Sequence, residues 1–178
     1  LLVKMVPLVR LPRLIRKGHL KALAVTASSY SSGEHVTFFE SAEPVKPWVR
    51  SQRKAARDRI THEHLLASSA IPFIFPAKGI EVDGHVEYFG DGSMRQSAPI
   101  APAIHLGAER ILVIGAGRMH EPKNDAAANP TPNYPSLAQI AGHALSNIFL
   151  DALAVDVERV QRINQTLSLI PEEKRLHS

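Results

Sequence analysis

An aspartate between two glycines is the group in this sequence best placed to do chemistry. Asp91 follows a short aromatic segment and stands between Gly90 and Gly92. Asp-Gly is also a frequent turn sequence, so the motif by itself is compatible with a simple bend. Two features favour a site: ligands of open α/β sheets usually bind beyond strand ends, and flanking glycines let a substrate approach the carboxylate closely. The motif is therefore either a turn or half of an active site.

Two strands and a helix precede this aspartate. Residues 20–27 are almost wholly apolar, which predicts a strand buried on both faces of a sheet. After a turn, residues 35–40 are β-branched and aromatic and predict a strand that runs back. Thr61 is the predicted N-cap of a helix that Pro72 must end. Residues 41–60 contain prolines and a basic run and are expected to form a crossing loop with some helix.

A hairpin and a further helix and strand surround the aspartate. Asp83-Gly84 separates two alternating segments and is a strong signal for a two-residue hairpin turn. Beyond Asp91, residues 97–108 predict a helix closed by Gly107, and residues 110–115 predict a second strand buried on both faces. A strand, a helix and another apolar strand in this order favour an α/β fold.

These elements predict one domain over residues 1–178, with its core at 20–115. The sheet is expected to be mostly parallel, with one hairpin. Residues 116–135 contain Pro, Asn, Gly and Ala with little apolar periodicity and predict a mobile surface loop. Residues 136–168 carry apolar side chains at intervals of three to five residues, which predicts a long C-terminal helix or two joined helices.

The composition excludes several classes of protein and site. The chain is 44% hydrophobic and 21% charged, as in ordinary soluble globular proteins, and has no apolar run of the roughly 18 residues that a membrane-spanning helix requires. The absence of Cys excludes disulfides, thiolate metal sites and Cys nucleophiles. The basic run at 45–59 can meet phosphates, anionic lipid or only water; a solvated surface is the preferred interpretation, and no nucleic-acid partner is expected because aromatic residues are not interleaved with it.

Four stretches of the chain resemble, in their order, the C-terminal half of patatin-like phospholipases. They are TASSYSSGEHVTFF, HLLASSAIPFIFP, GDGSMRQSAPIAPAIHLGAERILVIG and DVERVQRIN, and they span roughly residues 21–164. The most specific combination is Ala-Ser-Ser-Ala-Ile-Pro, then Asp-Gly followed by a small residue, then Leu-Gly-Ala before an apolar strand. The resemblance implies an α/β sandwich fold and a serine lipid acyl hydrolase that uses a Ser-Asp dyad.

Carried over by position, Asp91 matches the dyad aspartate, and Gly90 and Gly92 form the turn beside the site. In the family this aspartate accepts the serine proton and orients the hydroxyl. A fully solvated carboxylate would be a feeble base, so apolar surroundings are expected from the residues nearby in sequence, Tyr88, Phe89 and Pro99.

The serine of the dyad is not apparent. A nucleophile on a Gly-x-Ser-x-Gly turn and backbone donors for the oxyanion are required, and no Ser in the chain has glycines both two before and two after it. Ser93 stands where the family usually has Gly or Ala, and it is not expected to be the nucleophile because it adjoins the base. The resemblance therefore implies that the chain supplies the aspartate, is inactive alone, and belongs to a hydrolase whose N-terminal part was cut off, not expressed or supplied as another chain.

The expected partners follow from this interpretation. They are a lipid or other acyl ester substrate, and either the N-terminal half of the same protein or a second copy, because loss of the first strands would expose an apolar edge beside 20–27 or 110–115. No cofactor is expected, and no metal either, since His62 and His64 point to different sides of the predicted helix. A cytoplasmic location with peripheral contact at the inner membrane is the default expectation.

Two other functions are compatible with the sequence. One is a noncatalytic lipid-binding or regulatory domain on the same fold. The other is a dinucleotide-binding α/β protein, suggested by Gly115-Ala116-Gly117 after an apolar segment, although His120 stands where the third glycine is required and a loop follows in place of a helix. Ser68 and Ser69 are interpreted as small residues that allow tight packing.

Overall fold

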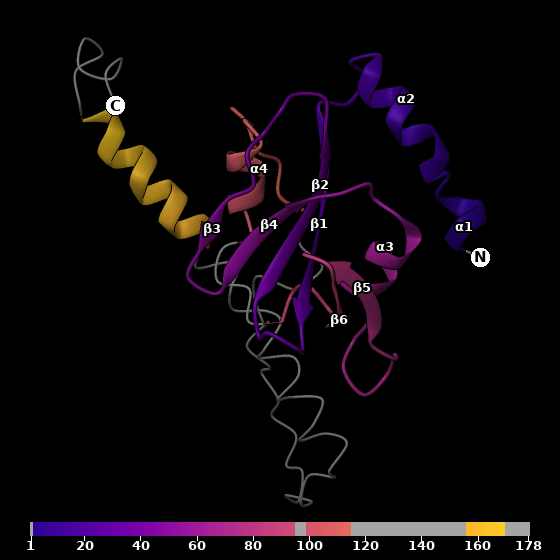
Figure 1. Ribbon diagram of the computed structural model, residues 1–178. Helices are drawn as coiled ribbons and strands as arrows, with labels where there is room; N and C mark the ends of the chain where they lie inside the picture. Colours follow the sequence, from indigo (N-terminus) through magenta and orange to yellow (C-terminus); the bar gives the residue numbers. More distant parts are fainter. Residues whose placement is uncertain (1, 95–98, 115–155, 170–178) are drawn as a thin grey trace, which may run out of the picture. The chain divides into compact units, whose positions relative to one another are not determined.

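The computed structural model describes residues 2–94, 99–114 and 156–169 (Figure 1). The chain divides into two compact units, Leu1–Gln96 with Ala101–Glu109, and Ser97–Ile100 with Arg110–Ser178, and each is described by itself. The first unit contains a mixed sheet and short helices, which confirms the expected α/β class at this coarse level.

Six strands form the sheet of the first unit, in the spatial order β3-β4-β2-β1-β6-β5. Four of the five strand pairs are antiparallel, and β2 with β4 is the parallel one. The bounds are Ala22–Ser29 for β1, His35–Ser41 for β2, Val49–Arg50 for β3, Arg53–Arg57 for β4, Lys78–Val82 for β5 and His85–Gly90 for β6.

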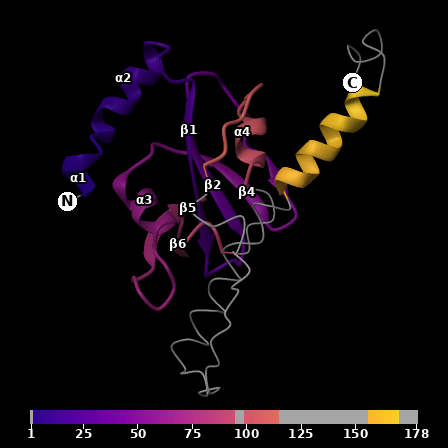
Figure 2. The ribbon, with the colours of Figure 1, turned by 180° about the vertical axis from the view of Figure 1, so that it is seen from behind.

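Short helices flank this sheet. They are α1 (Leu2–Met5), the 3-10 helix η1 (Leu8–Arg10), α2 (Leu11–Arg16), α3 (His62–Ser68) and α4 (Ala101–His105). Figures 1 and 2 show α3 beside β5 and β6, and α4 towards β3 and β4. The core lies between α3, α2 and the sheet, where Phe38 and Phe89 meet edge to face with ring centroids 5.4 Å apart.

The predicted positions of β1, β2 and α3 and of the hairpin formed by β5 and β6 are confirmed. The β1 strand pairs with β2 in the antiparallel register that runs from Ala22 opposite Ser41 to Ser28 opposite His35. Its predicted burial on both faces is wrong for the first half of the strand, because residues 22–24 are only half-buried. Asp83 and Gly84 turn the chain between β5 and β6 with φ of 53° and 81°, the left-handed values that this two-residue turn needs. The α3 helix begins after Thr61 and ends before Pro72, as predicted.

Three predictions about the sheet and its connections are wrong. It is not mostly parallel, because short turns join β1 to β2, β3 to β4 and β5 to β6, and strands joined by short turns pair antiparallel. Residues 41–60 hold no helix but contain β3 and β4, which a turn at Ser51 and Gln52 joins. Residues 111–114 do not form a buried strand: they have no regular structure, and Leu112 and Ile114 are 87% and 88% exposed.

The β1 strand is fully paired on one side and mostly open on the other. β2 accompanies it from Ala22 to Ser28, whereas β6 pairs with Ser28 and Ser29 alone. Alongside residues 22–27, no other strand of the described residues completes the sheet. Two side chains of this segment, Val25 and Ala27, belong to the buried core.

The second unit is described in part. Residues 156–168 are helical, which agrees with the C-terminal end of the predicted helical region. The buried Asp156 carboxylate accepts the Ile100 backbone N–H at 3.0 Å. The predicted loop 116–135 and the rest of the predicted helical region, 136–155, lie outside the described residues.

Within the described ranges, none of the helices has the length and apolar character needed to cross a membrane.

His64 completes the N-terminal cap of α3. Its Nδ1 accepts the Thr61 backbone N–H at 3.0 Å, and the buried ring packs on Phe38 with centroids 4.4 Å apart. Its Nε2 has no hydrogen-bond partner among the described residues, although Asp58 Oδ2 lies 3.6 Å away. Burial lowers the pKa of His64, and the opposing charges of Asp58 and Glu63 do not offset this effect.

We expect acid to destabilise the fold through His64. Because the folded-state pKa lies below the ordinary value of 6.5, the unfolded chain takes up this proton first; the stability is complete above that pH and falls as the pH drops below it. His64→Gln keeps a capping acceptor that does not titrate, so it should be less stable by roughly 1 kcal/mol at pH 7.5, with a deficit that shrinks towards pH 5. Urea unfolding at several pH values measures this difference. A constant deficit would contradict the prediction.

Candidate functional site

Asp91 lies directly after β6, and hydrogen bonds to two neighbouring elements fix the backbone around it. The Asp91 N–H donates to the Ala70 carbonyl at 3.0 Å, and the Gly92 N–H donates to the Ser68 carbonyl at 3.1 Å. From the other direction, the Ser28 hydroxyl donates to the Asp91 carbonyl at 2.9 Å. The end of α3 and the end of β1 therefore hold this aspartate between them.

The two glycines beside Asp91 are required by close contacts within the protein. A Cβ atom at Gly92 would overlap the Thr26 backbone carbonyl, and a Cβ atom at Gly90 would overlap the Tyr30 ring. The space beside each glycine is thus filled by the chain itself. Their role in this structure is to let the turn pass close to β1, which differs from the sequence-based expectation that they admit a substrate.

The Asp91 side chain is half-buried and bonded on one of its two oxygens. Oδ1 accepts the Ser93 backbone N–H at 2.8 Å and the Ser93 hydroxyl at 2.6 Å. For Oδ2, no hydrogen bond is found within the described part of the chain. Ser93, which follows Asp91 by two residues, therefore orients the carboxylate and leaves its second oxygen available.

Tyr30 is the aromatic side chain whose ring reaches the turn that contains Asp91. Partial burial raises the pKa of Tyr30, and the Asp91 charge raises it further, so the phenol stays neutral at physiological pH. The Tyr30 N–H donates to the Tyr88 carbonyl at 2.8 Å, which continues the pairing of β1 and β6 into the turn. The expected apolar environment is partly met, because Phe89 is buried whereas Tyr88 is exposed.

Ser28 and His35 form a buried pair next to this turn. The Ser28 Oγ lies 3.2 Å from His35 Nδ1 and also donates to the Asp91 carbonyl. The three residues superficially resemble a catalytic triad, yet Asp91 contributes its backbone rather than its carboxylate. Ser28 is buried and its hydroxyl is engaged, so this arrangement holds the turn and presents no nucleophile to a substrate.

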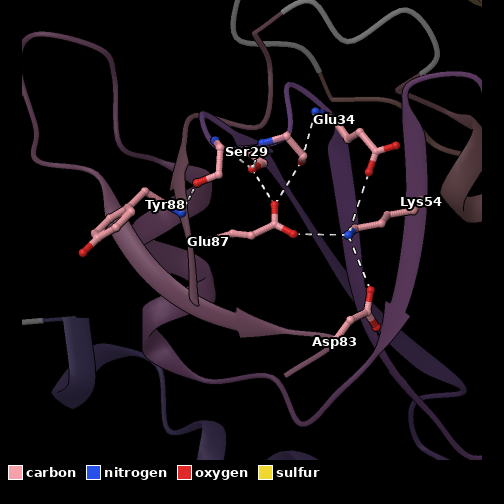
Figure 3. Close-up of polar contacts among 8 residues, drawn as sticks. Ser29, Glu34, Lys54, Asp83, Glu87 and Tyr88 are labelled. Atoms are coloured by element: carbon pink, nitrogen blue, oxygen red, sulfur yellow. Dashed lines mark hydrogen bonds and ion pairs between the residues drawn. The ribbon is translucent and has the colours of Figure 1, made fainter. Parts of the chain in front are cut away.

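A second polar cluster secures the hairpin that carries Asp91 (Figure 3). Glu87 of β6 points into it and is 15% exposed. Its Oε2 accepts the Ser29 hydroxyl at 2.6 Å and the Ser32 hydroxyl at 3.0 Å, and its Oε1 lies 3.3 Å from Lys54 Nζ. Figure 3 shows Lys54 reaching towards Glu87, Glu34 and Asp83, the last two at 3.8 and 3.6 Å.

Glu87 and Lys54 are each held in the charged form. Burial opposes the charge of Glu87, but hydrogen bonds from Ser29, Ser32 and Lys54, together with the Lys54 charge, outweigh it and lower the pKa of Glu87. Burial likewise opposes the charge of Lys54, and the hydrogen bond and three carboxylates outweigh it and raise the pKa of Lys54. The ammonium occupies the centre of the acidic cluster, and no group of residues suited to a metal ion is found in the described ranges.

The other residues singled out in the sequence bring no reactive side chain to Asp91. Ser69 bonds back to Leu65 of its own helix, and Ser68 offers its carbonyl to Gly92, which agrees with a packing role for both. His62 Nε2 lies 2.8 Å from the Val6 carbonyl. The glycines at 115 and 117, on which a dinucleotide site depended, lie outside the described residues.

Sequence reasoning missed Tyr30, Ser28 and Glu87. Each acts through the pairing of β1 with β6, which a sequence does not specify, so their types alone did not mark them. The available signal was the run of serines at the end of β1 and in the turn after it, since such residues often bond to nearby backbone groups and form turns.

Comparison of the chain with protein-family models, with curated proteins and with solved structures finds no match. The patatin-like resemblance therefore depends on the motifs quoted from the sequence. The geometry around Asp91 is an independent observation that any functional proposal must accommodate.

We expect Gly92→Ala to destabilise the fold, because the new Cβ would overlap the Thr26 backbone carbonyl, which cannot move without disturbing β1. The cost should be about 2–3 kcal/mol, as for overpacking against a rigid neighbour. Gly79→Ala is the matched control, since its Cβ would meet the flexible Val86 side chain at 3.2 Å, and it should cost much less. Chemical denaturation compares the variants. Equal losses would show that the contact at Gly92 yields readily.

Proposed function

We propose that this chain supplies the general base of a patatin-type serine acyl hydrolase that cleaves lipid or other acyl esters with a Ser-Asp dyad. Asp91 carries the proposal: it lies at a strand end, its backbone is bonded to two neighbouring elements, and its Oδ2 has no hydrogen bond among the described residues. A general base must stay within hydrogen-bond reach of the proton that it removes, and a backbone fixed in this way supports such a role.

In the proposed mechanism, Asp91 Oδ2 accepts the proton of a serine hydroxyl as the serine oxygen attacks the ester carbonyl. The proton then passes to the departing alkoxide, and water activated by the same carboxylate hydrolyses the acyl-serine. Ser93 holds Oδ1 through its N–H and hydroxyl, so it acts as a positioning residue. The neutral Tyr30 phenol places no second charge beside the carboxylate.

The serine is proposed to come from a segment outside residues 1–178. Ser28 is buried and bonded, and Ser93 is bound to the base by its own backbone, so neither is presented as a nucleophile. The open side of β1 along residues 22–25, beyond the contact of Gly92 with Thr26, supports an additional strand. Because Gly92 lies against Thr26, a segment added there would pass close to the Asp91 turn.

A second candidate is a noncatalytic lipid-binding domain on the same fold. The loop between Pro72 and Pro76 favours it, because Phe73 is 98% exposed and its two neighbours, Ile74 and Phe75, are also exposed. Exposed apolar loops of this kind mark contacts with lipid or protein. A cytoplasmic protein with peripheral contact at the inner membrane accommodates either candidate, and the two differ in whether an ester is hydrolysed.

The decisive variant for catalysis is Asp91→Asn in the protein that joins this chain to the segment bearing the serine. Asn keeps an oxygen for Ser93 and the shape of the turn, but it cannot accept the serine proton. We expect kcat for a short-chain acyl ester to fall by about 10²–10⁴-fold, with little change in KM. Initial-rate kinetics with a chromogenic ester measure this.

Asp83→Asn is the matched control, because it removes a carboxylate of the same hairpin at a turn position that suits Asn. It should retain kcat within a small factor. Equal losses in the two variants would contradict the role of Asp91. Lipid binding without turnover by the wild-type protein would favour the noncatalytic candidate.

A further inference from the structure

Two arginines face each other across the hairpin at the β3 edge of the sheet. The register of β3 and β4 places Arg50 directly opposite Arg53, on either side of the turn at Ser51 and Gln52. Like charges directly opposite each other destabilise an antiparallel pair. His105, the last residue of α4, lies near enough that both arginine charges affect it. Three groups that carry or can acquire positive charge therefore converge at this edge.

No acidic side chain of the described residues balances this cluster. Among the described residues, no ion pair joins Arg50 or Arg53 to a carboxylate, whereas the adjacent Lys54 meets three of them on the opposite face of the sheet. The Arg50 Nη1 donates to the neighbouring Val49 carbonyl at 3.0 Å. The Arg53 Nε is buried and has no hydrogen-bond partner in the described ranges. A buried donor without an acceptor is costly, so an anion that accepts a hydrogen bond from Arg53 Nε would stabilise this edge.

An aromatic stack makes this edge rigid. Trp48 lies between Phe39 and His105, with ring centroids 5.5 and 4.6 Å away and interplanar angles of 24° and 19°. The stack fixes the His105 ring beside the two arginines. Trp48 is thereby committed to the stack, so the cationic groups rather than the indole remain for a ligand.

We infer that Arg50, Arg53 and His105 bind a phosphate group, either as free phosphate or as the headgroup of a phospholipid. Guanidinium groups match the oxygens of a phosphate in pairs, and a dianion offsets the repulsion between two facing arginines. The bound anion would also accept a hydrogen bond from the buried Arg53 Nε. This site gives a function to the basic run at 45–59, and it does not depend on the chemistry of Asp91.

The charges around His105 support the proposed anion site. Burial lowers the pKa of His105, and the charges of Arg50 and Arg53 lower it further. A bound phosphate would reverse the electrostatic part of this effect, so the His105 pKa should rise when phosphate is added.

Trp48 is the single Trp of the chain, so its fluorescence reports directly on the stack beside this cluster. Titration with sodium phosphate at pH 7.5, against sodium chloride of equal ionic strength, should give a saturable change with phosphate alone. The Arg50→Gln/Arg53→Gln variant should bind phosphate at least about tenfold more weakly. Arg13→Gln/Arg16→Gln removes the same charge from exposed positions of α2 and should bind as the wild type does.

Thermal unfolding gives a second readout that a merely structural role would not produce. Arg50→Gln should raise the Tm of the phosphate-free protein, because it removes a like-charge pair, and should abolish the rise in Tm that phosphate produces in the wild type. A lower Tm for this variant, together with an unchanged response to phosphate, would overturn the inference.

Vesicles distinguish the two sources of phosphate. Sedimentation with phosphatidylcholine vesicles that contain phosphatidic acid, released by free phosphate and lost in the Arg50→Gln/Arg53→Gln variant, assigns the site to a headgroup. A fluorescence response to phosphate without vesicle binding assigns it to free phosphate. The inference is overturned if chloride reproduces the response, or if the α2 control variant loses as much binding as the hairpin variant.

Discussion

The hairpin that carries Asp91 joins the rest of the sheet through two backbone pairs, and the candidate site depends on what secures it there. Ser28 and Ser29 provide those pairs, and their hydroxyls extend the attachment in two directions. Ser28 bonds to the Asp91 carbonyl, while Ser29 bonds to Glu87 on the adjoining strand. The carbonyls at the end of α3 complete the attachment from the helical side. The aspartate is therefore positioned by a few polar contacts that come from two elements, the end of β1 and the end of α3.

The charged side chains on the two faces of β4 have different partners. Lys54 meets three carboxylates and reaches Glu87 across β2 and β1, so its charge joins the middle of the sheet to the β5–β6 hairpin. Arg53, its neighbour in sequence, points to the opposite face, where it meets Arg50 and no carboxylate of the described residues. A polar cluster whose members are all paired holds its elements together, whereas like charges that face each other are destabilising until an ion of opposite sign binds between them. The first cluster is structural, and the second accounts for the proposed phosphate site.

Local signals predicted much of this fold, and long-range pairing accounts for what they missed. The Asp83-Gly84 turn, the Thr61 cap and the apolar β1 strand follow from neighbouring residues, and each is present. The short strand β4 has a basic, alanine-containing sequence with weak strand preference, and it is held as a strand by β2. Residues 111–114 have a strong strand preference, yet no pairing partner holds them in the described structure. Asp91 was identifiable from its flanking glycines, but Tyr30 and Glu87 became recognisable only when the register of β1 and β6 was known.

The central claim is that Asp91 activates a serine located outside residues 1–178. Fluorophosphonate labelling followed by intact-mass analysis and peptide mapping tests it most directly, because only an activated serine reacts at an appreciable rate. The account predicts one phosphonyl group on a serine beyond this chain, with labelling that is lost when Asp91 is replaced by Asn. A label on Ser93 or any other serine within residues 1–178, equal labelling of the Asp91→Asn protein, or no labelling at all would contradict it.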